Sequence, residues 1–247
     1  MKVRATVSYD GTQFGGFQRQ TNARSVQGEI EAALETLSGT RVGLVGAGRT
    51  DAGVHATGQV VAFTLDWTHG LAALTKAINV NLPQDVAVRE LAECDERFHP
   101  RFSAVSRRYE YTIAICAVRK PMMRLYAWQL EHELDVAKMA EAAQHLMGQH
   151  DFAAFGSATS GESTVREIYR ADWAVIGQEP EVLRFNIEAN GFLFRMVRRI
   201  VATLVRVGQG KIGPDEVREI LVSREGNQAK GAAPACGLSL VSVKYGD

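Results

Sequence analysis

Arg49, Thr50 and Asp51 form a triplet inside the glycine-rich stretch GAGRTDAGVHATG, residues 46–58. A carboxylate that acts as a nucleophile must be ionised, and a neighbouring guanidinium favours the ionised form inside a pocket. Glycines let a substrate approach the backbone closely. The alternative is a glycine-rich turn in which the aspartate bonds to its own backbone. The triplet alone leaves both interpretations open.

A second group of residues combines cations with aromatic rings. In FHPRFSAVSRRYEYTI, residues 98–113, Arg101, Arg107 and Arg108 precede Tyr109 and Tyr111 on an alternating segment. Cations suit phosphates and rings suit bases, so the combination is typical of a nucleic-acid surface. Packing of both tyrosines into a core, beside a solvated charged edge, explains the same pattern.

A third group lies in NGFLFRMVRRIVATLVRVGQG, residues 190–210, where arginines interrupt apolar residues at helical spacing. We predict a helix over residues 191–208. Arg195 and Arg199 are four residues apart and would share one face of it. Arg198 borders the apolar surface, and burial of an arginine is costly unless a carboxylate meets it. The alternative is that its side chain extends past the apolar surface to solvent.

Composition narrows the class of protein. The 247 residues include 28 basic and 28 acidic side chains, and 46% are hydrophobic, as in ordinary globular proteins. Arginine accounts for 21 of the basic residues, and it suits phosphate and carboxylate binding. The three cysteines and six histidines lack metal spacing, and the glycine patterns of nucleotide-binding loops are missing, so we expect no metal and no cofactor. The absence of a long apolar run or a signal peptide predicts a cytoplasmic protein without membrane contact.

Periodicity and helix-end signals predict the elements that would position these residues. Strands are expected over residues 2–9, 42–45, 58–65, 86–93, 107–116, 168–175, 182–188 and 238–245. Besides the arginine-rich helix, we expect helices between Ser25 and Gly39, around residues 71–78, between Asp135 and Gly148, and from Pro214.

The order of these elements predicts an α+β fold of two ferredoxin-like, RRM-like (split βαβ) units, whose antiparallel sheets are flanked by helices. We place the boundary in the linker VRKPMMRLYAW. Residues 1–118 would form an N-terminal domain that carries the aspartate loop. Residues 119–247 would form a C-terminal domain that completes the active-site cleft. Open sheets of this kind often bind RNA, although a fold alone assigns no function.

Six segments, spread nearly end to end, resemble the TruA family of tRNA pseudouridine synthases in type and order. GRTDAGVHA is the most specific part, and a chance match to all six is implausible. Phe194 and Arg195 occupy positions where the family varies. The segments are YDGTQFGGFQRQ (residues 9–20), GAGRTDAGVHATGQV (46–60), NLPQDV (81–86), RFHPRFSAVSRRYEYTI (97–113), GFLFRMVRRIV (191–201) and APACGLSLVSVKY (233–245).

The resemblance implies a cofactor-free homodimer that isomerises uridine to pseudouridine at positions 38, 39 and 40 of the tRNA anticodon stem-loop. It implies that Asp51 is the catalytic aspartate and that Arg49 occupies or steers the space left by the flipped base. Tyr109 would stack on the uracil, and Arg198 would pair with Asp51. Leu238 would line the uracil pocket. The expected RNA-binding residues are Arg101, Arg107, Arg108, Arg195 and Arg199.

Several alternatives stay open at this point. Asp51 could attack C1′ of the ribose, attack C6 of the base, or remove the C2′ proton. An RNA-binding module without catalysis is a second possible function, but the RRM signature is absent and Asp51 with Arg198 would then lack a purpose. A nucleoside glycosidase is a third, but it usually needs a second carboxylate opposite the first, and none stands out near the motifs.

Overall fold

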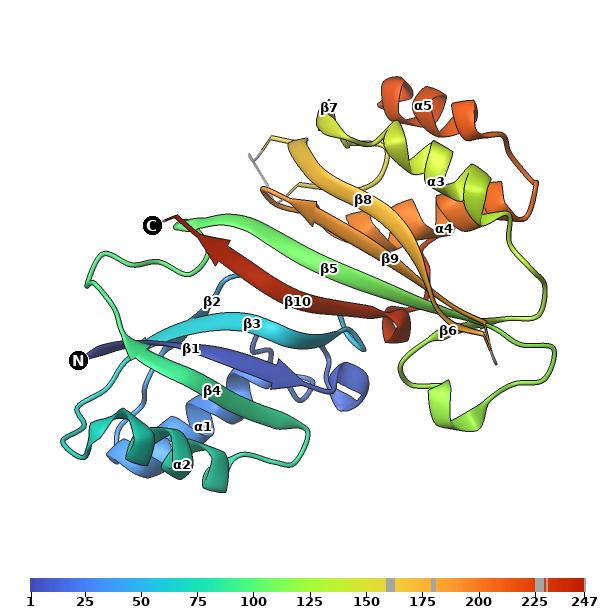
Figure 1. The fold of residues 1–247 in the computed structure, drawn as a ribbon. Coiled ribbons are helices and arrows are strands. Elements are labelled where there is room, and N and C mark those ends of the chain that lie inside the picture. The colour runs from blue at the N-terminus through green and yellow to red at the C-terminus, as the bar shows by residue number, and fades with distance from the viewer. Residues whose placement is uncertain (159–162, 179–180, 225–228, 230, 247) are drawn as a thin grey trace. The chain divides into compact units, whose positions relative to one another are not determined.

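The computed structural model describes residues 1–158, 163–178, 181–224, 229 and 231–246 (Figure 1). Contacts divide the chain into two units, Met1–Val105 with Ser239–Asp247, and Ser106–Leu238. Each unit combines a sheet with helices, which confirms the mixed α and β class. This division differs from our predicted boundary after residue 118. The last strand, β10 (Leu238–Tyr245), pairs in parallel with a strand of unit 1 and so belongs mainly to that unit.

In unit 1, a central strand β1 is antiparallel to both of its neighbours, β3 and β4. The other edge of β3 pairs antiparallel with β2 near one end and parallel with β10 near the other. Besides β10, the elements of unit 1 are β1 (Lys2–Tyr9), a 3-10 turn (Gly11–Gln13), α1 (Val26–Ser38), β2 (Leu44–Gly46), β3 (His55–Thr64), α2 (Gly70–Asn81) and β4 (Val86–Glu93).

The core of unit 1 lies between its strands and the two helices, which Figure 1 shows on one face of the strands. Helix α1 begins after Ser25, whose hydroxyl accepts a hydrogen bond from the Gly28 N–H at 3.3 Å. It ends at Gly39, which adopts the left-handed conformation with φ +69°. Ile30 and Leu34 are fully buried on its inner side. Both predicted helix-end signals of α1 are therefore confirmed.

Unit 2 is built on a sheet in which β9 lies between β5 and β8, antiparallel to both. Strand β7 pairs with β8, and β6 pairs in parallel with β5. Helices α3, α4 and α5 pack on one another beside these strands (Figure 1). The elements are β5 (Ala104–Ile115), β6 (Trp128–Leu130), α3 (Val136–Gln144), β7 (Gly148–Asp151), β8 (Val165–Gln178), β9 (Glu181–Ala189), α4 (Met196–Gly208) and α5 (Pro214–Ser223), with 3-10 turns at Pro121–Met123 and Ala235–Gly237.

Helix α4 begins at Met196, five residues later than predicted. Arg195 has φ +59°, a left-handed conformation that a helix does not continue through. The preceding residues run beside the segment around Gly156, and the Phe194 N–H donates to the Ser157 carbonyl at 3.1 Å. The prediction that residues 191–195 are helical is therefore wrong.

Within the described residues, no helix combines the length and the apolar character needed to cross a bilayer.

We predict that Gly58→Ala lowers the free energy of unfolding by about 1–3 kcal/mol. A Cβ at Gly58, in β3, would lie 2.1 Å from the Val241 carbonyl oxygen of β10, so one strand must shift. The urea unfolding midpoint measures the effect. Thr57→Ala, at the exposed neighbouring position of β3, is the control and should change the stability by less than about 0.5 kcal/mol. Equal midpoints for the two variants would contradict the close approach of β10.

Candidate active site

Backbone hydrogen bonds hold the loop that carries Asp51. Asp51 forms an isolated antiparallel bridge with Gly16, from the segment between β1 and α1. The Phe17 N–H donates to the Thr50 carbonyl at 3.1 Å, and the Val54 N–H donates to the Asp51 carbonyl at 3.1 Å. The main chain before the half-buried aspartate is thus fixed to a second loop, and the main chain after it is fixed within its own turn.

The glycines of the two loops permit this close approach. Gly16 has φ +118°, and a Cβ there would lie 2.8 Å from the Thr50 carbonyl oxygen. A Cβ at Gly46 would lie 2.4 Å from the Phe17 ring. We expected the glycines to make room for a substrate. In the structure, Gly16 and Gly46 make room for segments of the chain itself.

The buried side chains of Tyr9 and Gln59 support the aspartate loop, and sequence analysis missed both roles. The Thr50 hydroxyl and the Tyr9 hydroxyl are hydrogen-bonded at 2.8 Å. The Gln59 side chain is fully buried and donates from Nε2 to the Gly48 carbonyl at 2.9 Å. The detectable signal for Gln59 is an amide in the apolar run QVVAF, since a buried amide needs a partner.

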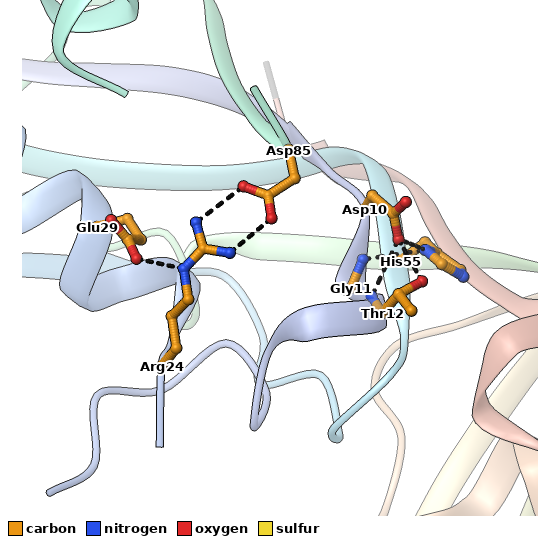
Figure 2. Close-up of polar contacts among 7 residues, drawn as sticks. All are labelled: Asp10, Gly11, Thr12, Arg24, Glu29, His55 and Asp85. Atoms are coloured by element: carbon orange, nitrogen blue, oxygen red, sulfur yellow. Dashed lines mark hydrogen bonds and ion pairs between the residues drawn. The ribbon is translucent and has the colours of Figure 1, made fainter. Parts of the chain in front are cut away.

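A cluster of polar groups fixes the start of the second loop, just after β1 (Figure 2). The Gly11 N–H donates to Nδ1 of His55 at 3.0 Å. Asp10 Oδ1 accepts from the Thr12 N–H at 3.0 Å and from the Thr12 hydroxyl at 2.6 Å. The buried His55 ring, also 3.2 Å from Asp10 Oδ1, therefore joins the first residue of β3 to this loop.

Arg49 lies in the same loop as Asp51, two residues earlier, and its side chain is exposed. The loop therefore carries a half-buried carboxylate two residues after a solvent-accessible guanidinium. Such a pair can offer a nucleophile or base together with a cation for a polynucleotide.

Tyr109, Arg198 and Leu238 belong to unit 2. Tyr109 lies on the apolar face of β5 and is only 8% exposed, with its ring edge-on to Phe192 at 5.2 Å between centroids. Arg198, in the first turn of α4, donates from Nε to the Ala233 carbonyl at 2.7 Å. Leu238 is 5% exposed.

The segment before β10 is held by two residues of unit 2. The Ala233 N–H donates to the Arg198 carbonyl at 2.9 Å, so Arg198 binds Ala233 through both main chain and side chain. The Tyr111 hydroxyl donates to the Pro234 carbonyl at 2.8 Å, and a Cβ at Gly237 would lie 2.6 Å from the Tyr111 ring. Burial raises the pKa of Tyr111 well above its ordinary value, so this hydroxyl stays a donor.

Arg107 and Arg108 lie on opposite faces of β5 because side chains alternate along a strand. Arg107 shares the face of Tyr109 and donates to the Asn190 carbonyl at 2.8 Å. Arg108 donates to Glu110 at 3.0 Å on the other face. The two arginines therefore do not form one continuous basic surface.

Arg101 and Arg195 each lie beside an exposed phenyl ring. The Arg101 guanidinium is 5.5 Å from the centroid of Phe102, which is 75% exposed. The Arg195 guanidinium is 4.9 Å from the centroid of Phe194, which is 56% exposed. Arg199, four residues after Arg195, is half-buried, and its N–H donates to the Arg195 carbonyl at 3.0 Å.

Among the residues that the structure describes, no three His, Cys, Asp or Glu side chains gather closely enough to hold a metal ion.

The sequence of the chain matches one family of known proteins over most of its length. The profile of a family described as tRNA pseudouridine synthase matches residues 5–103 and 142–246. The chain is 42% identical over 245 residues to tRNA pseudouridine synthase A of Geobacter sp. strain M21, covering 98% of each chain. It is 43% identical over 248 residues to the protein of that name from Bacillus pumilus, covering 99% of each.

The similarity to solved structures is weaker. A chain of an H/ACA RNP bound to a substrate RNA containing 2'-deoxyuridine matches with a TM-score of 0.37 and 12% identity. The match covers 81% of this chain and 43% of that chain. A TM-score this low does not establish a shared fold.

We predict that Tyr9→Phe and Thr50→Val each destabilise the protein, and that the double variant is little worse than either single one. Both substitutions remove the same buried hydrogen bond, so their effects should be coupled by about 0.5–1.5 kcal/mol. Urea unfolding of the two single variants and the double variant measures the coupling. Strictly additive effects would show that the two hydroxyls do not depend on each other.

Proposed function

We propose which tRNA positions this chain modifies and which residue is catalytic, and both proposals start from one fact. The chain belongs to the family of tRNA pseudouridine synthases. It is thus an isomerase that acts on tRNA. We propose that it converts uridine to pseudouridine at positions 38, 39 and 40 of the anticodon stem-loop, and that Asp51 is the catalytic aspartate.

The observation that supports Asp51 most directly is the way its loop is held. The backbone on both sides of Asp51 is hydrogen-bonded to the loop after β1 or within its own turn. Catalytic groups gain most when their position is set before the substrate arrives. A turn that needed only to reverse the chain would not require a second loop, a buried threonine hydroxyl and a buried glutamine amide.

The reaction sets three demands on such a site. The bond between N1 of uracil and C1′ of the ribose must break, the base must rotate, and C5 must bond to C1′ as C5 loses a proton and N1 gains one. The target nucleotide must first leave the base stack, at a cost of a few kcal/mol. In our proposal Asp51 acts at C1′, at C6 or at the C2′ proton, and Arg49 occupies or steers the space that the flipped base leaves.

The wider RNA surface would combine rings with cations. Arg101 with Phe102, and Arg195 with Phe194, each offer an exposed ring beside a guanidinium. Such pairs suit unstacked bases next to phosphates. Arg108 is less suited to phosphate binding, because Glu110 already neutralises part of its charge. The roles of Arg107, Arg199 and Leu238, and the pairing of Arg198 with Asp51, stay predictions from the family.

Three broader predictions belong to the same proposal. The strand order β2-β3-β1-β4, with α1 before β2 and α2 before β4, supports a split βαβ arrangement for unit 1. Homodimerisation stays a prediction from the family and can be measured by light scattering. A cytoplasmic location stays a prediction from the sequence.

We expect Asp51→Asn and Asp51→Ala to abolish pseudouridine formation, with losses on the order of 10⁴-fold in kcat and little change in RNA binding. The asparagine keeps the shape of the side chain but removes the charge. Tritium released from uridine labelled at C5 in anticodon stem-loop RNA measures turnover. Asp66→Asn changes an exposed aspartate of unit 1 and should retain full activity. Turnover by Asp51→Asn near that of the unmodified protein would overturn the assignment.

Tyr109→Leu should lower kcat more than Tyr109→Phe, because only the phenyl ring can still stack on uracil. Leucine also removes the edge contact with Phe192, so packing must be separated from stacking. Phe192→Leu removes the same contact from the other side and serves as the control. If Tyr109 stacks on the substrate, Phe192→Leu lowers the unfolding free energy but keeps kcat. Equal kcat losses in the two leucine variants would show that Tyr109 only packs.

A further inference from the structure

Arg24 binds two carboxylates (Figure 2). One belongs to Asp85, which is far away in the sequence, and the other to Glu29 in the helix that follows Arg24. Its Nη1 and Nη2 donate to the two oxygens of Asp85 at 2.6 and 3.0 Å, in a bidentate pair. Its Nε donates to Glu29 of α1 at 2.5 Å. Asp85 lies in the turn between α2 and β4, so the guanidinium joins this turn to the start of α1.

The same arginine holds the loop that contacts Asp51. Its guanidinium lies 4.3 Å from the centroid of the buried Phe14 ring. Its carbonyl accepts a hydrogen bond from the Gly15 N–H at 2.8 Å. Phe14 and Gly15 immediately precede Gly16, which forms the bridge with Asp51.

A second connection runs from Asp85 to the same loop. The Asp10 N–H donates to the Asp85 carbonyl at 3.0 Å, so Asp85 fixes the first residue of the loop through its main chain. The Gly53 N–H donates to the Phe14 carbonyl at 3.4 Å. This bond joins the residues after Asp51 to Phe14, whose ring lies against the Arg24 guanidinium. The contacts thus form a continuous path from Asp85 to Asp51.

The charges around Arg24 distinguish this role from RNA binding. Two carboxylates contact one guanidinium, and the pKa of Arg24 is raised, chiefly by the hydrogen bonds that it donates to Asp85. All three donor nitrogens are engaged, so little of the charge remains for a phosphate. Lysine could not replace the arginine, because a point charge lacks both the bidentate fork and the flat surface that covers the Phe14 ring.

We propose that Arg24 and Asp85 are positioning residues for the reaction: together they clamp the loop of residues 10–17, and that loop sets the position of Asp51. The proposal rests on the catalytic role of Asp51 proposed above. Neither residue touches the reacting nucleotide. Their loss should displace the carboxylate slightly and leave most of the RNA contacts intact.

The test is a double-mutant cycle on Arg24→Met and Asp85→Asn, with turnover measured by tritium release from anticodon stem-loop RNA. Each single variant should lower kcat on the order of 10- to 100-fold with KM little changed, since small misplacements of catalytic groups cost about that much. The double variant should lose no more than the worse single variant, because both changes break one clamp. Arg24→Lys should recover only part of the lost kcat.

The controls separate this role from general stability and from RNA binding. Arg170→Met and Asp172→Asn break a comparable arginine–aspartate pair on β8 and should leave kcat unchanged. All variants are assayed well below their urea and thermal midpoints, with circular dichroism to verify folding. Should Arg24→Met fail to fold, Asp85→Asn and Arg24→Lys, which alter the shape of the side chains least, decide the question.

The possible outcomes are distinct. Unchanged kcat in the folded Arg24 and Asp85 variants overturns the clamp, as does a rise in KM alone or a strictly additive double variant. Full activity of Asp51→Asn overturns the catalytic assignment instead, whatever the Arg24 variants do. An inactive Asp51→Asn protein together with fully active Arg24→Met and Asp85→Asn proteins rejects the clamp and keeps the proposed function.

Discussion

The close approach of two glycine-rich loops, joined through their backbones, is the constraint on which the candidate site depends. Gly16 meets the main chain at Thr50 and Asp51 at a distance that leaves no room for a Cβ. Ordering a residue costs about 1–2 kcal/mol, and glycine loses the most freedom. Each backbone hydrogen bond contributes only about 1 kcal/mol net. The hydrogen bonds alone therefore cannot keep these loops ordered.

Buried aromatic rings supply the missing stabilisation. Phe14 and Phe17 flank Gly16 in its loop, and each is only 3% exposed. Burial of a side chain of this size contributes about 1.5–3 kcal/mol, more than any one of the hydrogen bonds. Phe17 fits against Gly46, and Phe14 lies under Arg24. The rings hold the loops together, and the hydrogen bonds then set the register in which Gly16 faces Asp51.

Local signals in the sequence predicted the regular elements well, because those elements depend on local pattern. The bounds of β1, β4 and β10 match the prediction, and the N-cap at Ser25 and the end at Gly39 define α1. The short strands β6 and β7 were missed, since segments this short carry too few alternating residues. The late start of α4 depends on contact with the segment around Ser157, which no helical periodicity can reveal.

Motif resemblance selected Asp51, but it could not reveal how the chain holds it. The supporting residues come from three separate segments: Tyr9 from the first strand, Gln59 from β3, and Asp85 from the turn before β4. Nothing in their spacing along the chain links them. The opposite placement of Arg107 and Arg108, in contrast, follows from strand alternation and was available from the sequence.

Support through the backbone also bears on the chemistry that we propose for Asp51. Attack at C1′, attack at C6 and removal of the C2′ proton need different approach angles, but each needs a carboxylate whose position is set before the nucleotide arrives. The bridge to Gly16 and the bond from Val54 use the main chain of Asp51, so the position of its Cα does not rely on its carboxylate oxygens. The same backbone support therefore suits each of the three routes proposed for Asp51.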